Sequence, residues 1–279
     1  MARYGIGPIA LAMATAGAFA LGISIALAPA PATRQSNDAF PPVPAALAFP
    51  SAPPLHAEER AAFGQVIRDY LIENPEVLVE AFRVLEERQM LAEEQADFER
   101  VRANADALWN DSESWIGGNL DGEITIVEFI DYKCGFCKRA KPEVDALVAA
   151  NADVRIIRRE FPILGPESVL ATRAALSVLN TDGPDAYEAL SDQLMTFTGP
   201  ITENVLRRFA ERAGADADAM IAGMDDVEIS QQIQSNRALA QRLGITGTPS
   251  FIFDERLVRG FLPQAQMEQT LELIRNINN

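Results

Sequence analysis

The spacing of apolar residues predicts two consecutive helices at the start of the foldable part of the chain. Apolar side chains recur every three or four positions on one face of each helix, at Phe63, Val66, Ile67, Tyr70, Leu71, Val77, Leu78, Ala81, Phe82 and Leu85. Proline suits the first turn of a helix, so Asn74-Pro75 marks the break, and Asn74 is the expected N-cap. Two such helices form no core alone, so we expect this face to mediate self-association, with docking inside the same chain as the alternative.

Four later stretches are expected to form strands, because β-branched and aromatic residues dominate them. They lie at residues 124–131, 154–158, 250–253 and 257–259. Helical patterns fill residues 166–243, a block longer than a single crossover helix needs, and an amphipathic helix around Leu271 ends the chain. The pattern therefore predicts an α/β domain over residues 110–279 with a helical insertion at about 166–243, preceded by a helical segment over residues 57–109.

Residues 1–30 combine a basic start with a long uncharged run, which is typical of an export signal. The run at 6–28 is mostly Ala, Leu, Ile and Gly and ends among small residues, as a cleavage site does. It approaches the length of a membrane span, so an uncleaved inner-membrane anchor is the alternative. Proline-rich sequence then predicts an extended linker over residues 31–56. We expect the rest of the chain to be exported to the periplasm.

Composition narrows the kinds of site that the chain can hold. It has 24 Lys and Arg against 40 Asp and Glu, and this net charge of -16 argues against a nucleic-acid partner. One histidine, His56, and two cysteines exclude zinc sites built from four Cys and His ligands. The acid is concentrated in residues 58–113, with 15 acidic residues against six arginines. The chain has three lysines, Lys133, Lys138 and Lys141, and all lie close to the cysteines. With Arg139 they are expected to form a basic collar around the cysteines, and the alternative is that they simply face water.

Both cysteines belong to one motif, Cys134-Gly135-Phe136-Cys137, between an expected strand and an expected helix. In this setting the C-x-x-C spacing is typical of thiol-disulfide redox chemistry. A structural disulfide is one alternative, but closing so short a loop contributes only about 2 kcal/mol; a metal half-site would need cysteines from two chains. We expect Cys134 to be the exposed nucleophile, because a helix N-terminus favours its thiolate. Cys137 should be more buried and should resolve the mixed disulfide.

Glu128 lies inside the apolar strand, six residues before Cys134. A carboxylate in a buried run is costly and usually has a function. We expect it to accept or relay the proton of Cys137, and the alternative is a side chain near a strand end that reaches solvent. No cofactor and no metal ion are expected at this site.

These residues resemble the DsbA-like branch of the thioredoxin superfamily over about residues 110–279. The matching pieces occur in the family's order, as Glu128-Phe129, the C-x-x-C motif, Arg159-Glu160-Phe161-Pro162, the helical insertion and Gly247-Thr248-Pro249. The resemblance implies a thioredoxin-like fold and a cis Thr248–Pro249 bond beside the cysteines, where these two residues and Phe136 contact the substrate. The familiar oxidase has Pro-His between its cysteines, so we expect a higher Cys134 pKa and a less oxidising disulfide here.

Residues 63–88 are similar to the helical N-terminal segment of ScsC-type proteins, exported DsbA-like proteins that in several cases oligomerise and act as disulfide isomerases. The resemblance implies a periplasmic thiol-disulfide oxidoreductase, and we expect a homo-oligomeric isomerase that acts on exported client proteins with cysteines. It also implies a membrane redox partner, either a DsbD- or ScsB-like reductant or a DsbB-like oxidant. A dithiol oxidase of DsbA type and a copper-tolerance protein that binds Cu(I) through its thiolates are the alternatives.

Overall fold

A computed structural model describes residues 56–278 and divides the chain into two compact units at Tyr70 and Leu71. The expected export signal or anchor lies outside the described residues, as does the expected linker apart from its last residue, His56. Among the helices of residues 56–278, none has both the length and the apolar character needed to cross a bilayer.

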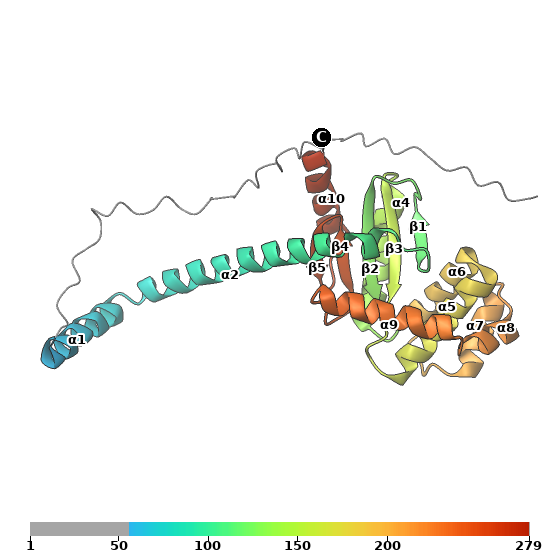
Figure 1. The fold of residues 1–279 in the computed structure, drawn as a ribbon, viewed down its shortest axis with the longest axis horizontal. Coiled ribbons are helices and arrows are strands. Elements are labelled where there is room, and N and C mark those ends of the chain that lie inside the picture. Colours follow the sequence, from blue (N-terminus) through green and yellow to red (C-terminus); the bar gives the residue numbers. More distant parts are fainter. Residues whose placement is uncertain (1–55, 279) are drawn as a thin grey trace, which may run out of the picture. The chain divides into compact units, whose positions relative to one another are not determined.

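The two expected N-terminal helices are present (Figure 1) as α1, Ala57–Glu73, and α2, Glu76–Ala103. Pro75, and not Asn74, occupies the N-cap position of α2. The second helix also ends before the predicted helical segment does, which extends to residue 109. Asn104 leaves the helical conformation at φ -115°, and a short helix α3, Ala105–Trp109, follows.

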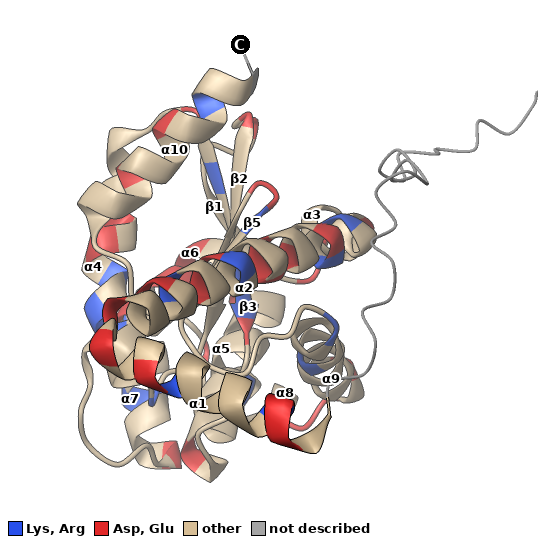
Figure 2. Cartoon of the chain, turned by 90° about the vertical axis from the view of Figure 1, so that its left-hand side faces the viewer, with Lys and Arg blue, Asp and Glu red and all other residues tan. Residues whose placement is uncertain are grey.

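The two halves of α2 differ in what they contact. Large apolar side chains of its first half are exposed, at Val77, Leu78, Val79, Phe82 and Leu85, and this exposure continues to Met90 and Leu91 just past its middle. The second half packs on the domain, where Val101 is fully buried and Asp97 forms a bidentate ion pair with Arg259 at 2.5 and 2.8 Å. Acidic and basic side chains follow one another along this helix (Figure 2). The apolar face of α2 is therefore not buried against its own domain.

The domain is built on a five-stranded sheet with the order β1-β3-β2-β4-β5. Only β2 and β3 run parallel; the other neighbours are antiparallel. The bounds of β1 to β5 are Trp115–Gly118, Ile124–Ile130, Val154–Glu160, Ser250–Phe253 and Arg256–Arg259. Four strands follow the predicted β-branched runs, whereas β1 was not predicted. β2 lies at the centre, so the segment that follows it is held by the most buried part of the sheet.

The two faces of the sheet are covered by different helices, because side chains alternate along β2. Ile126 and Ile130 pack with α4, Gly135–Ala150, and with the C-terminal helix α10, Gln264–Asn278. Val127 and Phe129 point to the other face, where they pack with Val101, Leu108 and Leu239 of α2, α3 and α9. Glu128 has the parity of Ile126 and therefore belongs to the α4 face.

The helical insertion between β3 and β4 contains five helices, α5 to α9. Their bounds are Pro166–Asp182, Pro184–Thr196, Glu203–Arg212, Ala217–Gly223 and Val227–Arg242. The breaks between these helices fall at glycine, proline and threonine residues, with Gly183 and Gly214 at positive φ and Thr202 accepting a hydrogen bond from the N–H of Val205 as the N-cap of α7. Helices α5 to α8 pack on the α4 face, where their core joins that of the cysteines, whereas α9 packs on the other face.

Candidate active site

The C-x-x-C motif occupies the turn from β2 into α4. Cys134 is the N-cap of α4, with extended φ and ψ of -75° and 114°. Its sulfur accepts a hydrogen bond from the backbone N–H of Cys137 at 3.3 Å. The nucleophile position predicted from the sequence is thus an N-cap whose side chain meets the unpaired N–H groups of the first helical turn.

Asp131 holds this turn in place, and sequence reasoning gave it no role. Its carboxylate is fully buried and accepts backbone N–H hydrogen bonds from Lys133 at 2.8 Å and from Ile163 and Leu164 at 2.8 and 3.0 Å. Its carbonyl accepts the N–H of Cys134 at 3.0 Å. One side chain therefore joins the end of β2 to the loop after β3.

The two thiols differ strongly in acidity. Hydrogen bonding from the Cys137 side chain, with backbone N–H groups of Cys137 and Phe136, lowers the pKa of Cys134 to about 6 against the opposing effect of burial. Burial raises the pKa of Cys137 far above its usual range, and the neighbouring Cys134 adds to this rise. Near neutral pH the pair therefore holds one thiolate and one thiol, which is the state needed for nucleophilic attack followed by resolution.

Cys134 is less accessible than the sequence led us to expect. Both cysteines are free, and Cys134 is only 5% exposed against 1% for Cys137. The cover comes from a loop 114 residues further along the chain, because the Cys134 sulfur lies 3.1 Å from the carbonyl oxygen of Thr248. The order of exposure is as predicted, but the expectation of an exposed nucleophile is wrong.

The loop over Cys134 contains the cis peptide bond between Thr248 and Pro249. Its two ends are tied down by hydrogen bonds, from the Ser250 hydroxyl to the Gly247 carbonyl and from the Gly260 N–H to the Pro249 carbonyl, both at 2.9 Å. The structure thus brings Thr248 to the cysteines, as the resemblance implied. Contact with substrate by Thr248 and Pro249 stays a prediction.

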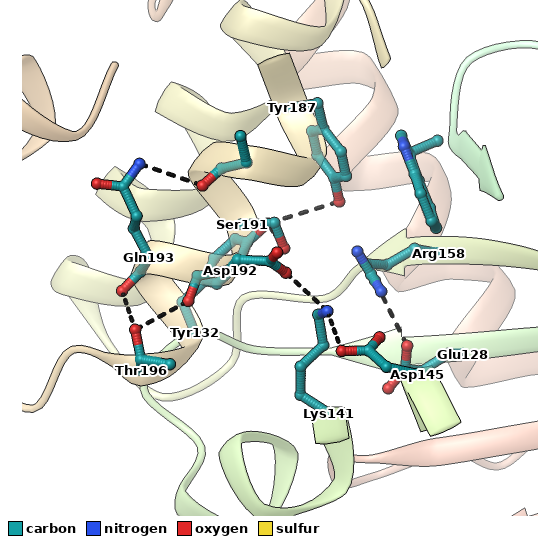
Figure 3. A network of polar contacts seen from close by, with 12 residues as sticks. Glu128, Tyr132, Lys141, Asp145, Arg158, Tyr187, Ser191, Asp192, Gln193 and Thr196 are labelled. Carbon is teal, nitrogen blue, oxygen red and sulfur yellow. Dashed lines mark hydrogen bonds and ion pairs between the residues drawn. The ribbon is translucent and has the colours of Figure 1, made fainter. Parts of the chain in front are cut away.

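Glu128 is buried and paired with a cation. It lies opposite Arg158 in the β2–β3 register; each side chain is 2% exposed, and Arg158 Nε lies 3.4 Å from Glu128 Oε2 (Figure 3). Burial raises the pKa of Glu128, and Arg158 opposes the rise. The solvent-reaching alternative is therefore wrong. The role of Glu128 in moving the proton of Cys137 stays a prediction.

The three lysines of the expected basic collar are occupied by partners inside the protein. Lys133 pairs with Glu167 at 2.9 Å, and Lys141 pairs with Asp145 and Asp192 at 2.6 and 2.7 Å (Figure 3). Lys138 donates to backbone carbonyls at the end of α6, including that of Leu194 at 3.2 Å. These lysines therefore do not form a collar of free positive charge. Each one instead links α4, or the segment that leads into α4, to the insertion.

Phe136, the third residue of the motif, is 54% exposed, so it is available for contact with a client. The guanidinium carbon of Arg139 lies 4.2 Å from the centre of its ring. A cation over an aromatic face is attracted by the ring quadrupole, so this contact holds the ring in one orientation. The proposed role of Phe136 in substrate binding is compatible with this position but is not tested by it.

The pattern of the DSBA-like thioredoxin domain family matches residues 125–272, more than half of the chain. The chain belongs to this family. Ahead of this DSBA-like domain, residues 59–90 match the N-terminal domain of the copper resistance protein ScsC. The family match covers both cysteines, the Glu128–Arg158 pair and the cis-proline loop.

Solved structures similar to this chain include a thioredoxin-like oxidoreductase from Silicibacter pomeroyi DSS-3, at 40% identity and a TM-score of 0.58 over 61% of this chain and 97% of that one. Proteus mirabilis ScsC in a transitional conformation has 28% identity and a TM-score of 0.57, over 78% of this chain and 97% of that one. The Na(+)/H(+) antiporter NhaA of Herminiimonas arsenicoxydans is 27% identical over 161 residues, 57% of this chain. The chain spans about a quarter of the length of that curated relative, 25%.

A second buried carboxylate of the DSBA-like domain, Glu160, also went unassigned in the sequence. It is 1% exposed and accepts hydrogen bonds from the hydroxyls of Tyr132 and Tyr187, both at 2.6 Å, and of Thr172 at 2.9 Å. Burial raises the pKa of Glu160 to about 7, although these hydroxyls oppose the rise. The sequence signal that could have pointed to Glu160 is its place in Arg159-Glu160-Phe161-Pro162. That motif supported the family resemblance, but the resemblance assigned no role to Glu160.

Proposed function

We propose that this protein is a thiol-disulfide oxidoreductase of exported proteins that works mainly as a disulfide isomerase. The observation that carries the proposal is the Cys134 sulfur, held at the N-cap of α4 with a pKa of about 6 and covered by the Thr248 carbonyl at 3.1 Å. A thiolate at neutral pH beside the cis-proline loop suits attack on a disulfide presented by an extended client segment.

The exchange needs no co-reactant for isomerisation. The Cys134 thiolate attacks one sulfur of a client disulfide, that bond breaks, and a client thiolate leaves as the mixed disulfide forms. The released thiolate then attacks another client disulfide or the mixed disulfide, so the electrons stay within the pair of proteins. When reshuffling stalls, Cys137 loses its proton and attacks Cys134, which releases a reduced client and leaves Cys134–Cys137 oxidised. A dithiol of a membrane reductase would then restore the pair.

Glu128 is proposed to take the proton of Cys137 during resolution. The carboxylate is buried on the α4 face of the sheet, which also carries both cysteines in its core. Burial raises the pKa of Glu128, and a carboxylate with a raised pKa is a better proton acceptor. Arg158 limits that rise in pKa. The Glu128–Arg158 ion pair therefore keeps Glu128 available as a base at a buried position, where an isolated charge would cost too much free energy.

The acidity of Cys134 favours isomerase over strong oxidase. A strongly oxidising dithiol has a nucleophile pKa of about 3.5, because its reduced form is stabilised by the thiolate. The value of about 6 for Cys134 implies a smaller stabilisation of the reduced form. A thiol is also the best attacking group when its pKa is close to the ambient pH. Both effects favour repeated attack and release over one-way oxidation.

Refolding of a scrambled multi-disulfide protein tests this function. The reduced protein should restore the native disulfides, and Cys134→Ser should lose this activity completely. Cys137→Ser should keep a part of it, because attack and reshuffling need only the first thiol. If the reduced protein gives no rescue while the oxidised form rapidly introduces disulfides into a reduced client, the protein is an oxidase.

We also propose that the chain self-associates through the apolar side chains of α1 and α2. Those of α2 are exposed in the first half of the helix, and α1 contains no buried residue. Light scattering of the exported form should show an oligomer, and Phe82→Glu should shift it to a monomer with its thiol chemistry intact. Glu80→Lys is the matched control, because two residues apart in a helix places it on the opposite side. A wild-type monomer would contradict the proposal.

A further inference from the structure

Arg139 differs from the three lysines near the cysteines, because it is not bonded to the insertion. The three lysines are bonded to carboxylates or backbone carbonyls of the insertion. Within residues 56–278, the structure gives Arg139 no ion pair and no hydrogen bond, and its side chain is exposed. In a protein of net charge -16, a guanidinium next to the active site thus keeps its charge unneutralised.

Two aromatic rings hold this guanidinium in place of an acid. Its carbon lies 4.2 Å from the ring centre of Phe136 and 5.4 Å from that of Phe261. Phe136 belongs to the C-x-x-C motif, and Phe261 follows Gly260, whose N–H binds the Pro249 carbonyl at 2.9 Å. Arg139 therefore contacts both sides of the surface on which the proposed function places the client, the motif and the cis-proline loop.

The chemistry of a stacked guanidinium defines what it can bind. Its carbon lies over the two aromatic rings, and its five N–H donors lie in the plane of the group. This planar set of donors matches a carboxylate, which can accept two parallel hydrogen bonds. The rings restrict the side chain beforehand, so less rotamer freedom is lost when a carboxylate binds.

We infer that Arg139 is a specificity-determining residue that binds a carboxylate of the substrate close to the sulfur that joins Cys134. The substrate class is therefore a disulfide with an acidic group next to the reacting cysteine, such as a client segment with Asp or Glu beside it. This inference rests on the proposed thiol-disulfide exchange and adds a preference among its substrates.

Three small disulfides separate charge recognition from the exchange itself. Glutathione disulfide carries carboxylates, cystamine carries ammonium groups, and 2-hydroxyethyl disulfide is neutral. In a Cys137→Ser background, the Cys134 thiolate displaces one thiolate from each reagent, so one S–S bond breaks and one forms. Quenched mass spectrometry at pH 7.5 measures the rate constant of this single step.

Arg139→Gln should slow the reaction with glutathione disulfide about fivefold, the scale of one exposed charge pair. The rate with 2-hydroxyethyl disulfide should stay within about twofold, and that with cystamine should rise, because a like charge has been removed. Arg88→Gln removes the same charge from exposed α2 and should leave all three rates unchanged. Arg139→Lys keeps the charge without the planar donors and should recover only part of the preference.

An equal loss with all three reagents would overturn the inference, because it would mean that Arg139 only supports the motif. Full recovery by Arg139→Lys, or the same loss in Arg88→Gln, would overturn it as well, since a general charge effect would then suffice. Failure of the proposed function looks different: the unsubstituted protein would react with none of the three disulfides faster than a free thiol does.

Discussion

The first half of α2 and the paired strands β2 and β3 both depart from the usual distribution of side chains, in which large apolar groups are buried and charged groups are exposed. The helix carries large apolar residues in solvent, with Val79 at 70% exposed and Phe82 at 63%. The strands carry charge in the core, where Glu128, Arg158 and Glu160 are each 2% exposed or less. Each arrangement costs free energy in an isolated chain, so each needs a compensating contact or a function.

The difference lies in where the compensation is found. The buried charges have their partners inside the domain: an ion pair for Glu128, and three hydroxyl groups for Glu160. The exposed face of α2 has none within the part of the chain that the structure describes, which is why we assign it to another copy. We therefore propose that the charged core serves the chemistry and stability of one domain, and that the apolar first half of α2 serves assembly.

Breaking the buried pair should have the largest effect on stability. Arg158→Met leaves the Glu128 carboxylate without its opposite charge, and the free energy of unfolding should fall by about 3–5 kcal/mol in urea titrations. The double variant Glu128→Leu with Arg158→Met should regain most of this loss, because two apolar side chains can replace a buried ion pair. The double variant should nevertheless resolve mixed disulfides more slowly than the unsubstituted protein, because it lacks the Glu128 carboxylate. Normal resolution in it would remove Glu128 from the mechanism.

Glu160 should give the next largest effect, visible as a pH dependence. Its pKa is about 7 in the folded protein and 4.5 as the ordinary value, so the folded state binds the proton more tightly. Its contribution to stability is then greatest below pH 4.5 and is lost as the pH rises to 7, a difference of about 3 kcal/mol.

Urea titrations between pH 4.5 and 7 check this linkage. Glu160→Gln should flatten the fall in stability relative to the unsubstituted protein, since it has no proton to lose. Thr172→Val is the control, because it removes one hydroxyl partner and leaves the titrating carboxyl in place. Parallel pH profiles for Glu160→Gln and the unsubstituted protein would assign the pH dependence to other groups.

The contact between α2 and the domain should show the smallest effect on stability. Substitutions at this contact distinguish the two halves of the helix. Asp97 is 6% exposed and accepts both hydrogen bonds of Arg259, so Asp97→Ala should cost about 2 kcal/mol of unfolding free energy. Glu94 pairs with Arg256 in solvent, so Glu94→Gln should cost at most about 0.5 kcal/mol. Equal losses in thermal unfolding would show that burial of Asp97 does not seat the helix.

Local patterns predicted the parts of the fold that depend on neighbouring residues. The β-branched runs gave β2 to β5, and glycine, proline and threonine marked the breaks between the insertion helices. β1 was not predicted because it has four residues, two of them glycine, and is stabilised by pairing with β3 rather than by its own strand propensity. The spacing of Cys134 and Cys137 located the motif for the same local reason.

The missed features of the site all depend on contacts between residues far apart in the sequence. The burial of Cys134 comes from Thr248, whose place beside the cysteines was implied only by the family resemblance, and the hydroxyl groups around Glu160 come from Tyr132, Thr172 and Tyr187. The lysines looked like a basic collar because most of their partners lie on other helices, at Glu167, Asp192 and Leu194. A one-dimensional pattern gives the charge of a residue and not whether a distant carboxylate has already neutralised it.

The acidity of Cys134 is the most direct test of the central claim that this residue is a thiolate nucleophile near neutral pH. Alkylation of the reduced protein by iodoacetamide can be followed by mass spectrometry from pH 4 to 10, with Cys134→Ser as the blank. The account predicts that the rate at Cys134 rises with an apparent pKa of about 6 while Cys137 stays unreactive. An apparent pKa near the ordinary thiol value of about 8.5, or equal reactivity of both cysteines, would contradict it.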